Sequence, residues 1–169
     1  IELNEKFNFI KKNSNLLDIG STPGGWSQVA SKIITNGKIL AVDITPMEKL
    51  ENVIFLNSDF SEQKVQDKIL KTFDGKIDII VSDMAENTTG NKTVDSIRTN
   101  SLCTDVINFS LKVLTNKGSL VCKLFMGEDF LEVKNLAKKN FKNVDFFKPE
   151  SSKSESKEIY IICSSVKAL

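Results

Sequence analysis

Short apolar runs alternate with segments of helical spacing along the chain, and this alternation constrains the fold more than any other feature of the sequence. The predicted strands cover residues 15–20, 38–43, 53–56, 77–83, 118–124, 143–147 and 158–164. The predicted helices cover residues 26–34, 61–73, 94–114 and 129–139, with Ser61 as the expected cap of the second. Such an alternation specifies an α/β fold, a doubly wound and mostly parallel seven-stranded sheet with helices on both faces. Because no helix-length segment separates the last two strands, we expect the last strand to run antiparallel.

The length of the chain fits one compact domain. Its 169 residues contain no internal repeat and no Pro/Gly-rich linker, so we expect a single domain over residues 1–169. The apolar share of 40% and the charged share of 27% are ordinary for a soluble globular protein. No apolar run approaches the roughly 20 residues that cross a bilayer, so we expect no membrane partner. The chain starts at Ile1 without a methionine, which favours a trimmed N-terminus.

Cysteine and histidine usage excludes several kinds of site. The three cysteines, Cys103, Cys122 and Cys163, are odd in number and lack metal-ligand spacing. Reduced, buried thiols are therefore expected, in the cytoplasm or alternatively in a mitochondrion or another organelle. The sequence has no histidine, so it cannot build a Ser-His-Asp triad or a histidine-ligated metal site. We expect a monomer that needs no metal.

A glycine-rich turn joins the first predicted strand to the first predicted helix. It reads D-I-G-S-T-P-G-G-W and contains Gly20, Pro23, Gly24, Gly25 and Trp26. Glycines let the backbone pass close under a ligand, and a helix N-terminus offers unpaired amides. A dinucleotide site would use G-x-G-x-x-G around a pyrophosphate, a spacing that this turn lacks. The turn suits S-adenosylmethionine, a phosphate-free nucleoside whose ammonium Asp18 or a nearby acid could meet; an ordinary tight turn is the alternative.

Acidic residues follow two further predicted strands. Asp43 ends the second strand, where a carboxylate can accept hydrogen bonds from both ribose hydroxyls. Asp59 follows the third strand and is placed to contact the amino group of adenine. Either residue alone would more often be a turn residue or a helix cap. Together, at the carboxyl ends of successive strands, they predict one nucleoside pocket.

A third acidic residue, Asp83, ends the fourth predicted strand, and Lys123 lies near the end of the fifth. A lysine among mostly apolar strand residues requires an explanation, because an unpaired buried cation is costly. One explanation is a structural ion pair between Asp83 and Lys123. The other is a lysine that takes or orients the proton of a substrate hydroxyl. As a base, Lys123 would need a pKa lowered from about 10.4 by burial or by a second cation.

These residues resemble the FtsJ/RrmJ family of ribose 2′-O-methyltransferases. Successive motifs occur in the family's order: D-I-G-S-T-P-G-G-W-S-Q, A-V-D-I-T-P-M, S-D-F, S-D-M-A-x-N-x-x-G, V-C-K-L-F-x-G and K-P-x-S-S-x-S-x-S-K-E-I-Y. The resemblance covers nearly the whole chain. It implies a Rossmann-like methyltransferase domain, for which the antiparallel last strand is characteristic. It also implies S-adenosylmethionine as methyl donor and a ribose 2′-hydroxyl of RNA as acceptor.

The resemblance also implies roles for particular residues. The donor site includes Gly20, Pro23, Gly24, Gly25, Trp26, Asp43, Asp59 and Asp83. The family's catalytic Lys-Asp-Lys-Glu set is matched here by Asp83, Lys123 and Glu158, and its first lysine is expected upstream of Ile1. Glu86 stands where the family usually has proline, which adds a carboxylate to the substrate loop.

Within the family, P-G-G-W and S-D-M-A are closer to the branch that modifies large-subunit ribosomal RNA than to the transfer-RNA branch. The predicted partner is therefore ribosomal RNA or a ribosomal particle. The net charge of +1 gives no global nucleic-acid signal, although lysines accumulate in the last third of the chain, at Lys138, Lys139, Lys148, Lys153 and Lys157. Alternatives are another RNA as substrate, a small-molecule or protein methyltransferase, a noncatalytic RNA-binding module, and an NAD-dependent oxidoreductase.

Overall fold

The protein, described here from a computed structural model over residues 1–168, contains a seven-stranded sheet with five helices in that range. The strand order is β3-β2-β1-β4-β5-β7-β6. The strands are β1 (Leu16–Ile19), β2 (Ile39–Asp43), β3 (Ile54–Asn57), β4 (Ile77–Ser82), β5 (Leu114–Phe125), β6 (Phe141–Phe147) and β7 (Glu158–Val166). The helices are α1 (Glu2–Phe7), α2 (Gly25–Ile33), α3 (Gln63–Thr72), α4 (Lys92–Val113) and α5 (Phe130–Asn140).

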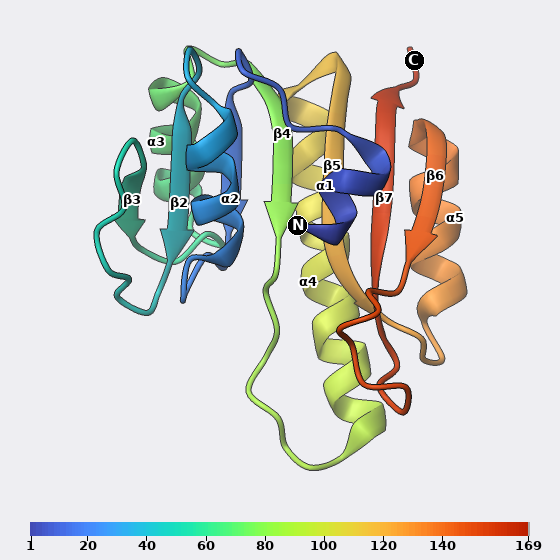
Figure 1. Cartoon of the computed structure of the whole chain (residues 1–169). Coiled ribbons are helices and arrows are strands. Elements are labelled where there is room, and N and C mark those ends of the chain that lie inside the picture. The colour runs from blue at the N-terminus through green and yellow to red at the C-terminus, as the bar shows by residue number, and fades with distance from the viewer. Residues whose placement is uncertain (169) are drawn as a thin grey trace.

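Strand direction confirms the predicted fold class. The pairs β3-β2, β2-β1, β1-β4 and β4-β5 are all parallel, whereas β7 runs antiparallel to both of its neighbours, β5 and β6. The two central strands β1 and β4 are apolar on both faces because helices cover both. In Figure 1, α1 and α2 lie in front of the sheet, and α3, α4 and α5 lie behind it.

Two apolar cores follow from this layering. Leu16, Ile79 and Val121 pack on the side of α1 and α2, together with Ala30 of α2. Leu17, Ile80 and Leu120 belong to the larger core on the other side, to which α3, α4 and α5 contribute. Alternate residues of the same strand therefore enter different cores, as the period of a strand requires. The sheet is fixed from both sides, which gives its carboxyl edge a defined geometry.

The structure corrects two details of the sequence prediction. The second predicted helix begins at Gln63 and not at Ser61, because the backbone N–H of Ser61 donates to Asp59 Oδ1 at 2.8 Å and forms a turn before the helix. The N-terminal helix α1 was not predicted; it has six residues, too few for helical spacing to be visible in the sequence. Its buried Leu3 nevertheless joins the core in front of the sheet.

In the part of the chain that the structure describes, no helix combines the length and the apolar character needed to cross a membrane.

Candidate functional site

The predicted site residues gather at the carboxyl edge of the parallel strands, the lower edge in Figure 1. Asp43 is the last residue of β2, and Asp83 directly follows β4. Lys123 lies near the end of β5. Because β7 is antiparallel, its first residue, Glu158, reaches the same edge and pairs with Phe125 at the end of β5. The topology therefore brings together side chains that are far apart in the sequence.

A cavity of about 480 Å³ opens beside the glycine-rich turn. Four of the predicted donor-site residues line it together: Gly20, Asp43, Asp59 and Asp83. Phe60, Met84 and Leu102 supply apolar walls, and Glu86 adds a further carboxylate. None of the described residues that line this cavity is Lys or Arg. Among the described lining residues Asp43, Asp59 and Glu86 have no cation beside them, and such carboxylates favour a positively charged nucleoside and disfavour the pyrophosphate of a dinucleotide.

Asp43 holds the glycine-rich turn against the end of β2. Its Oδ2 accepts a hydrogen bond from the backbone N–H of Thr22 at 2.9 Å, and its Oδ1 accepts one from Thr45 at 2.8 Å. Carboxylate oxygens can accept further hydrogen bonds from a ligand, because each carries two lone pairs. Asp43 therefore shapes the cavity wall and can still accept a ligand hydroxyl.

Gly20 lets the backbone turn tightly at the mouth of the cavity. Its φ of +69° lies in the left-handed region that favours glycine. A Cβ at this position would come within 2.6 Å of Met84 Cγ and 3.0 Å of the Met84 backbone. Glycine thus allows the loop after β4 to close over the end of β1.

A second cavity, of about 590 Å³, lies on the other side of the turn. Pro23, Gly25 and Trp26 line it together with Asp83 and Tyr160. Thr22 and Asp83 line both cavities, so the two spaces meet at Asp83. Gly24 lines neither: it is buried with a φ of +115°, and a Cβ there would lie 3.1 Å from Met47 Sδ.

Lys123 lines neither cavity but contacts Asp83, the residue at which the two cavities meet. Its Nζ lies 3.1 Å from Asp83 Oδ1 and 3.8 Å from Glu158 Oε2, so the three predicted catalytic residues form one cluster. The same Nζ donates to the backbone carbonyl of Asp83 at 3.4 Å. Only 13% of the lysine side chain is exposed. Two carboxylates therefore lie around a largely buried ammonium.

Tyr160 belongs to this cluster, although the sequence analysis assigned it no role. Its hydroxyl donates to Asp83 Oδ1 at 2.8 Å, and burial, followed by the charge of Asp83, raises the pKa of this phenol well above its usual value. Its ring meets Trp26 edge-on with centroids 6.2 Å apart. The signal was available: Tyr160 is two residues after Glu158, which places both side chains on one face of a strand.

Asp18 does not contact either cavity. Its side chain is fully buried, and its Oδ2 accepts a hydrogen bond from Ser27 Oγ at 2.7 Å. Its Oδ1 has no hydrogen-bond partner among the described residues. Burial raises the pKa of Asp18 to about 7. Asp18 therefore supports the turn from below, and a ligand ammonium would meet other acids.

The three cysteines are free and buried. Over residues 1–168, the structure places no group of three or more His, Cys, Asp or Glu side chains where they could hold a metal ion.

Comparison with known proteins agrees with this geometry. The profile of the FtsJ-like methyltransferase family matches residues 1–166. The chain belongs to this family. Ribosomal RNA large subunit methyltransferase E of Pelagibacter ubique is 44% identical over 163 residues, which cover 96% of this chain and 80% of that protein. The Rickettsia akari protein of the same name is 45% identical over 168 residues, covering 96% of this chain and 74% of the relative.

Solved structures share the fold. A crystal structure described as a ribosomal RNA methyltransferase of Plasmodium falciparum superposes with a TM-score of 0.86 at 32% identity, covering 98% of this chain and 93% of that one. The fibrillarin pre-rRNA processing protein of Methanococcus jannaschii shares the fold, with a TM-score of 0.69 at 17% identity over 93% of this chain and 68% of its own. The resemblance to the FtsJ family and the predicted methyltransferase fold are confirmed.

Proposed function

We propose that this FtsJ-like methyltransferase transfers a methyl group from S-adenosylmethionine to a ribose 2′-hydroxyl of large-subunit ribosomal RNA. The observation that carries the proposal is the cluster of Lys123 with Asp83 and Glu158, because Asp83 lines both cavities. A donor in one cavity and an acceptor in the other would both reach this cluster. The names of the 43–45% identical relatives support ribosomal RNA of the large subunit as substrate.

The lining of the first cavity fits the donor. Asp43 offers a carboxylate to a ribose diol, Asp59 one to an adenine amino group, and the apolar side chains of Phe60 and Leu102 suit the faces of a base. The amino acid end of the donor would extend past Asp83 to the mouth of the second cavity, where Pro23, Gly25 and Trp26 lie. Asp83, shared by both cavities, would lie beside the sulfonium. The donor, when bound, supplies an electrophilic methyl group.

The residues of the cluster position the 2′-hydroxyl and accept its proton. The Lys123 ammonium donates a hydrogen bond to the 2′-oxygen and fixes its position, and Glu158 holds this lysine in place. Lys123 and Tyr160 both contact Oδ1 of Asp83, which leaves Oδ2 to accept the proton of the hydroxyl. As the oxygen–methyl bond forms, the sulfur–methyl bond of the donor breaks and S-adenosylhomocysteine leaves. Alignment of the acceptor supplies much of the rate acceleration.

The RNA assignment has independent support in the charge of the substrate side. Lys148, Lys153 and Lys157 lie on or next to the segment between β6 and β7, which borders the reactive edge (Figure 1). Lysines interact with phosphates as point charges and suit backbone attraction better than base reading. We propose that the chain works as one domain and, as its bacterial relatives suggest, in the cytoplasm; an organelle is the alternative.

Lys123→Met tests the proposed role. We expect methyl transfer from labelled donor to large-subunit ribosomal RNA or particles to fall by at least about 100-fold. The dissociation constant of the donor, measured by calorimetry, should stay within about threefold. Lys117→Met, an exposed lysine at the other end of β5, serves as the matched control. Unchanged turnover of Lys123→Met would refute the role, and a product on transfer RNA, or one that is not a ribose 2′-O-methyl group, would refute the substrate.

A further inference from the structure

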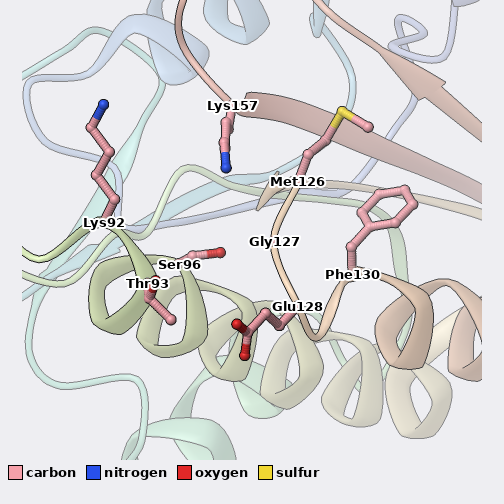
Figure 2. Close-up of a pocket in the computed structure, with 8 residues that line it drawn as sticks. All are labelled: Lys92, Thr93, Ser96, Met126, Gly127, Glu128, Phe130 and Lys157. Carbon is pink, nitrogen blue, oxygen red and sulfur yellow. The ribbon is translucent and has the colours of Figure 1, made fainter.

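A third cavity, of about 510 Å³, lies next to the catalytic cluster behind the sheet. Its lining comes from the first turn of α4, the β5–α5 connection and Lys157 (Figure 2). It continues the strand pairing of the catalytic residues: Phe125 pairs with Glu158, and one residue further the N–H of Met126 donates to the carbonyl of Lys157 at 2.9 Å. Met126 and Lys157, which line the cavity, are thus each one residue from the pair of Phe125 and Glu158.

A buried asparagine holds the floor of this cavity in place. Asn100 of α4 is fully buried; its Nδ2 donates to the Phe125 carbonyl at 3.0 Å and to Asp129 Oδ1 at 2.7 Å. Its Oδ1 accepts from the Phe125 N–H at 2.8 Å. These bonds fix the connection on both sides of Gly127, where a Cβ would collide with Ser96 Oγ. The cavity is therefore preformed.

One wall of the cavity is apolar. Met126 is 52% exposed, and the Phe130 ring is held by a tilted contact with Phe146 at 5.2 Å between centroids. Ile97 and Leu131, on the helices that border the cavity, are also more than 40% exposed. Exposed apolar side chains around a hollow indicate a surface that a ligand covers.

The rest of the lining is polar and suits a phosphate at one end. Lys157 points its ammonium into the cavity, and the Ser96 hydroxyl points toward the Gly127 segment from below (Figure 2). Ser96 is 7% exposed, and its Oγ has no hydrogen-bond partner within residues 1–168. The lining also includes Lys92, the first residue of the 22-residue helix α4. Glu128 lies at the end of the cavity away from Lys157, which restricts an anion to the Lys157 end.

We propose that this cavity binds a nucleotide adjacent to the methylated one. Its base packs against Met126 and Phe130, and its phosphate lies between Lys157 and the start of α4. The inference rests on the proposed function, because it takes RNA as the substrate. It also narrows the substrate: a base can enter the cavity only when it is unpaired, since a paired base is stacked inside an A-form helix. The enzyme therefore requires a single-stranded or opened segment next to its target.

The test compares Met126→Ser with Ile54→Ser, an exposed apolar residue on the distant edge strand β3. Binding is measured by fluorescence anisotropy with two probes, a short single-stranded RNA and an abasic ribose-phosphate oligomer of equal length. Met126→Ser should weaken binding of the RNA by about threefold to tenfold and leave binding of the abasic oligomer unchanged. Ile54→Ser should change neither. Equal effects of the two variants, or equal losses on both probes, would overturn the proposal.

Lys157→Gln tests the phosphate end, with Lys117→Gln as control. It should weaken binding of both probes and lower the slope of log affinity against log salt by about 0.7, the loss of one phosphate contact on a single strand. An unchanged slope contradicts the phosphate assignment. Methyl transfer by the unaltered protein is measured in parallel. If RNA binding depends on Met126 but the protein transfers no methyl group, the proposed function is refuted and the RNA-binding cavity is not. If methyl transfer is normal but Met126→Ser and Ile54→Ser bind RNA equally well, the cavity assignment is refuted and the proposed function is not.

Discussion

Asp18 should make the folded protein less stable as the pH rises from 4 to 7. The carboxyl lies under the glycine-rich turn with no exposed surface, and only one of its oxygens accepts a hydrogen bond. Burial disfavours the charged carboxylate and raises its pKa to about 7 in the folded protein, from 3.8 for a free side chain. We predict that Asp18→Asn removes this dependence.

The sign follows from proton binding. Below pH 4 the carboxyl is protonated in the folded and the unfolded chain, and it costs no stability. Between pH 4 and pH 7 the unfolded chain ionises first, so this residue destabilises the fold progressively as the pH rises through the folded pKa of about 7. A gap of about three between the two pKa values corresponds to about 4 kcal/mol at pH 8. Asn stays neutral throughout and keeps an oxygen that can accept the Ser27 hydroxyl.

The assay is urea unfolding of the original and Asp18→Asn proteins at several pH values from 4.5 to 8.5. Other carboxylates change stability in both proteins, so the difference between the two unfolding free energies is the informative quantity. That difference should move in favour of Asp18→Asn by about 3 kcal/mol between pH 4.5 and pH 8.5. An amide that fits poorly would add a constant offset only. A difference that is independent of pH would refute the burial argument.

Two further predictions concern the edge of the sheet. Asp43→Ala should weaken binding of S-adenosylmethionine by about tenfold or more in calorimetry, because it loses the carboxylate that orders Thr22 and Thr45. Asp67→Ala on α3 is the control and should bind the donor normally. Asn100→Ala should lower the free energy of unfolding in urea by about 3 kcal/mol, because it removes a buried side chain and leaves the half-buried N–H and C=O of Phe125 without these partners. A loss below about 1 kcal/mol would show that the floor of the third cavity can relax.

The periodic segments were predictable because burial alone decides them. Each predicted strand corresponds to an observed strand, and the antiparallel direction of β7 followed from the missing helix before it. The sequence could not show where α3 starts, because the Asp59 carboxylate captures the N–H of Ser61 in competition with a helix cap. Helix α1 was missed because its order comes from tertiary packing of Leu3 against the sheet.

The sequence predicted which residues form the candidate site better than it predicted how the site is divided into two cavities. Asp83, Lys123 and Glu158 were expected together, and strand pairing brings them within ion-pair distance. The sequence did not indicate that the glycine-rich turn has two sides, with Asp43 facing one cavity and Trp26 the other. Nor could it distinguish Asp18, which is buried, from the acids that line a cavity. These distinctions depend on which way a turn faces, which local patterns leave undetermined.

The position of Asp83 explains why one strand end can serve two ligands. Its backbone N–H is held by the carbonyl of Ile19 at 3.2 Å, its carbonyl accepts from Lys123, and its carboxylate accepts from Tyr160. These contacts come from three other strands, so Asp83 can shift toward one cavity only if β1, β5 and β7 shift with it. A methyl acceptor and a methyl donor must meet within a few tenths of an ångström, and a rigid residue shared by both cavities sets that distance. Under the proposed function, the sheet edge would contribute to the reaction by fixing the position of Asp83 between the two cavities.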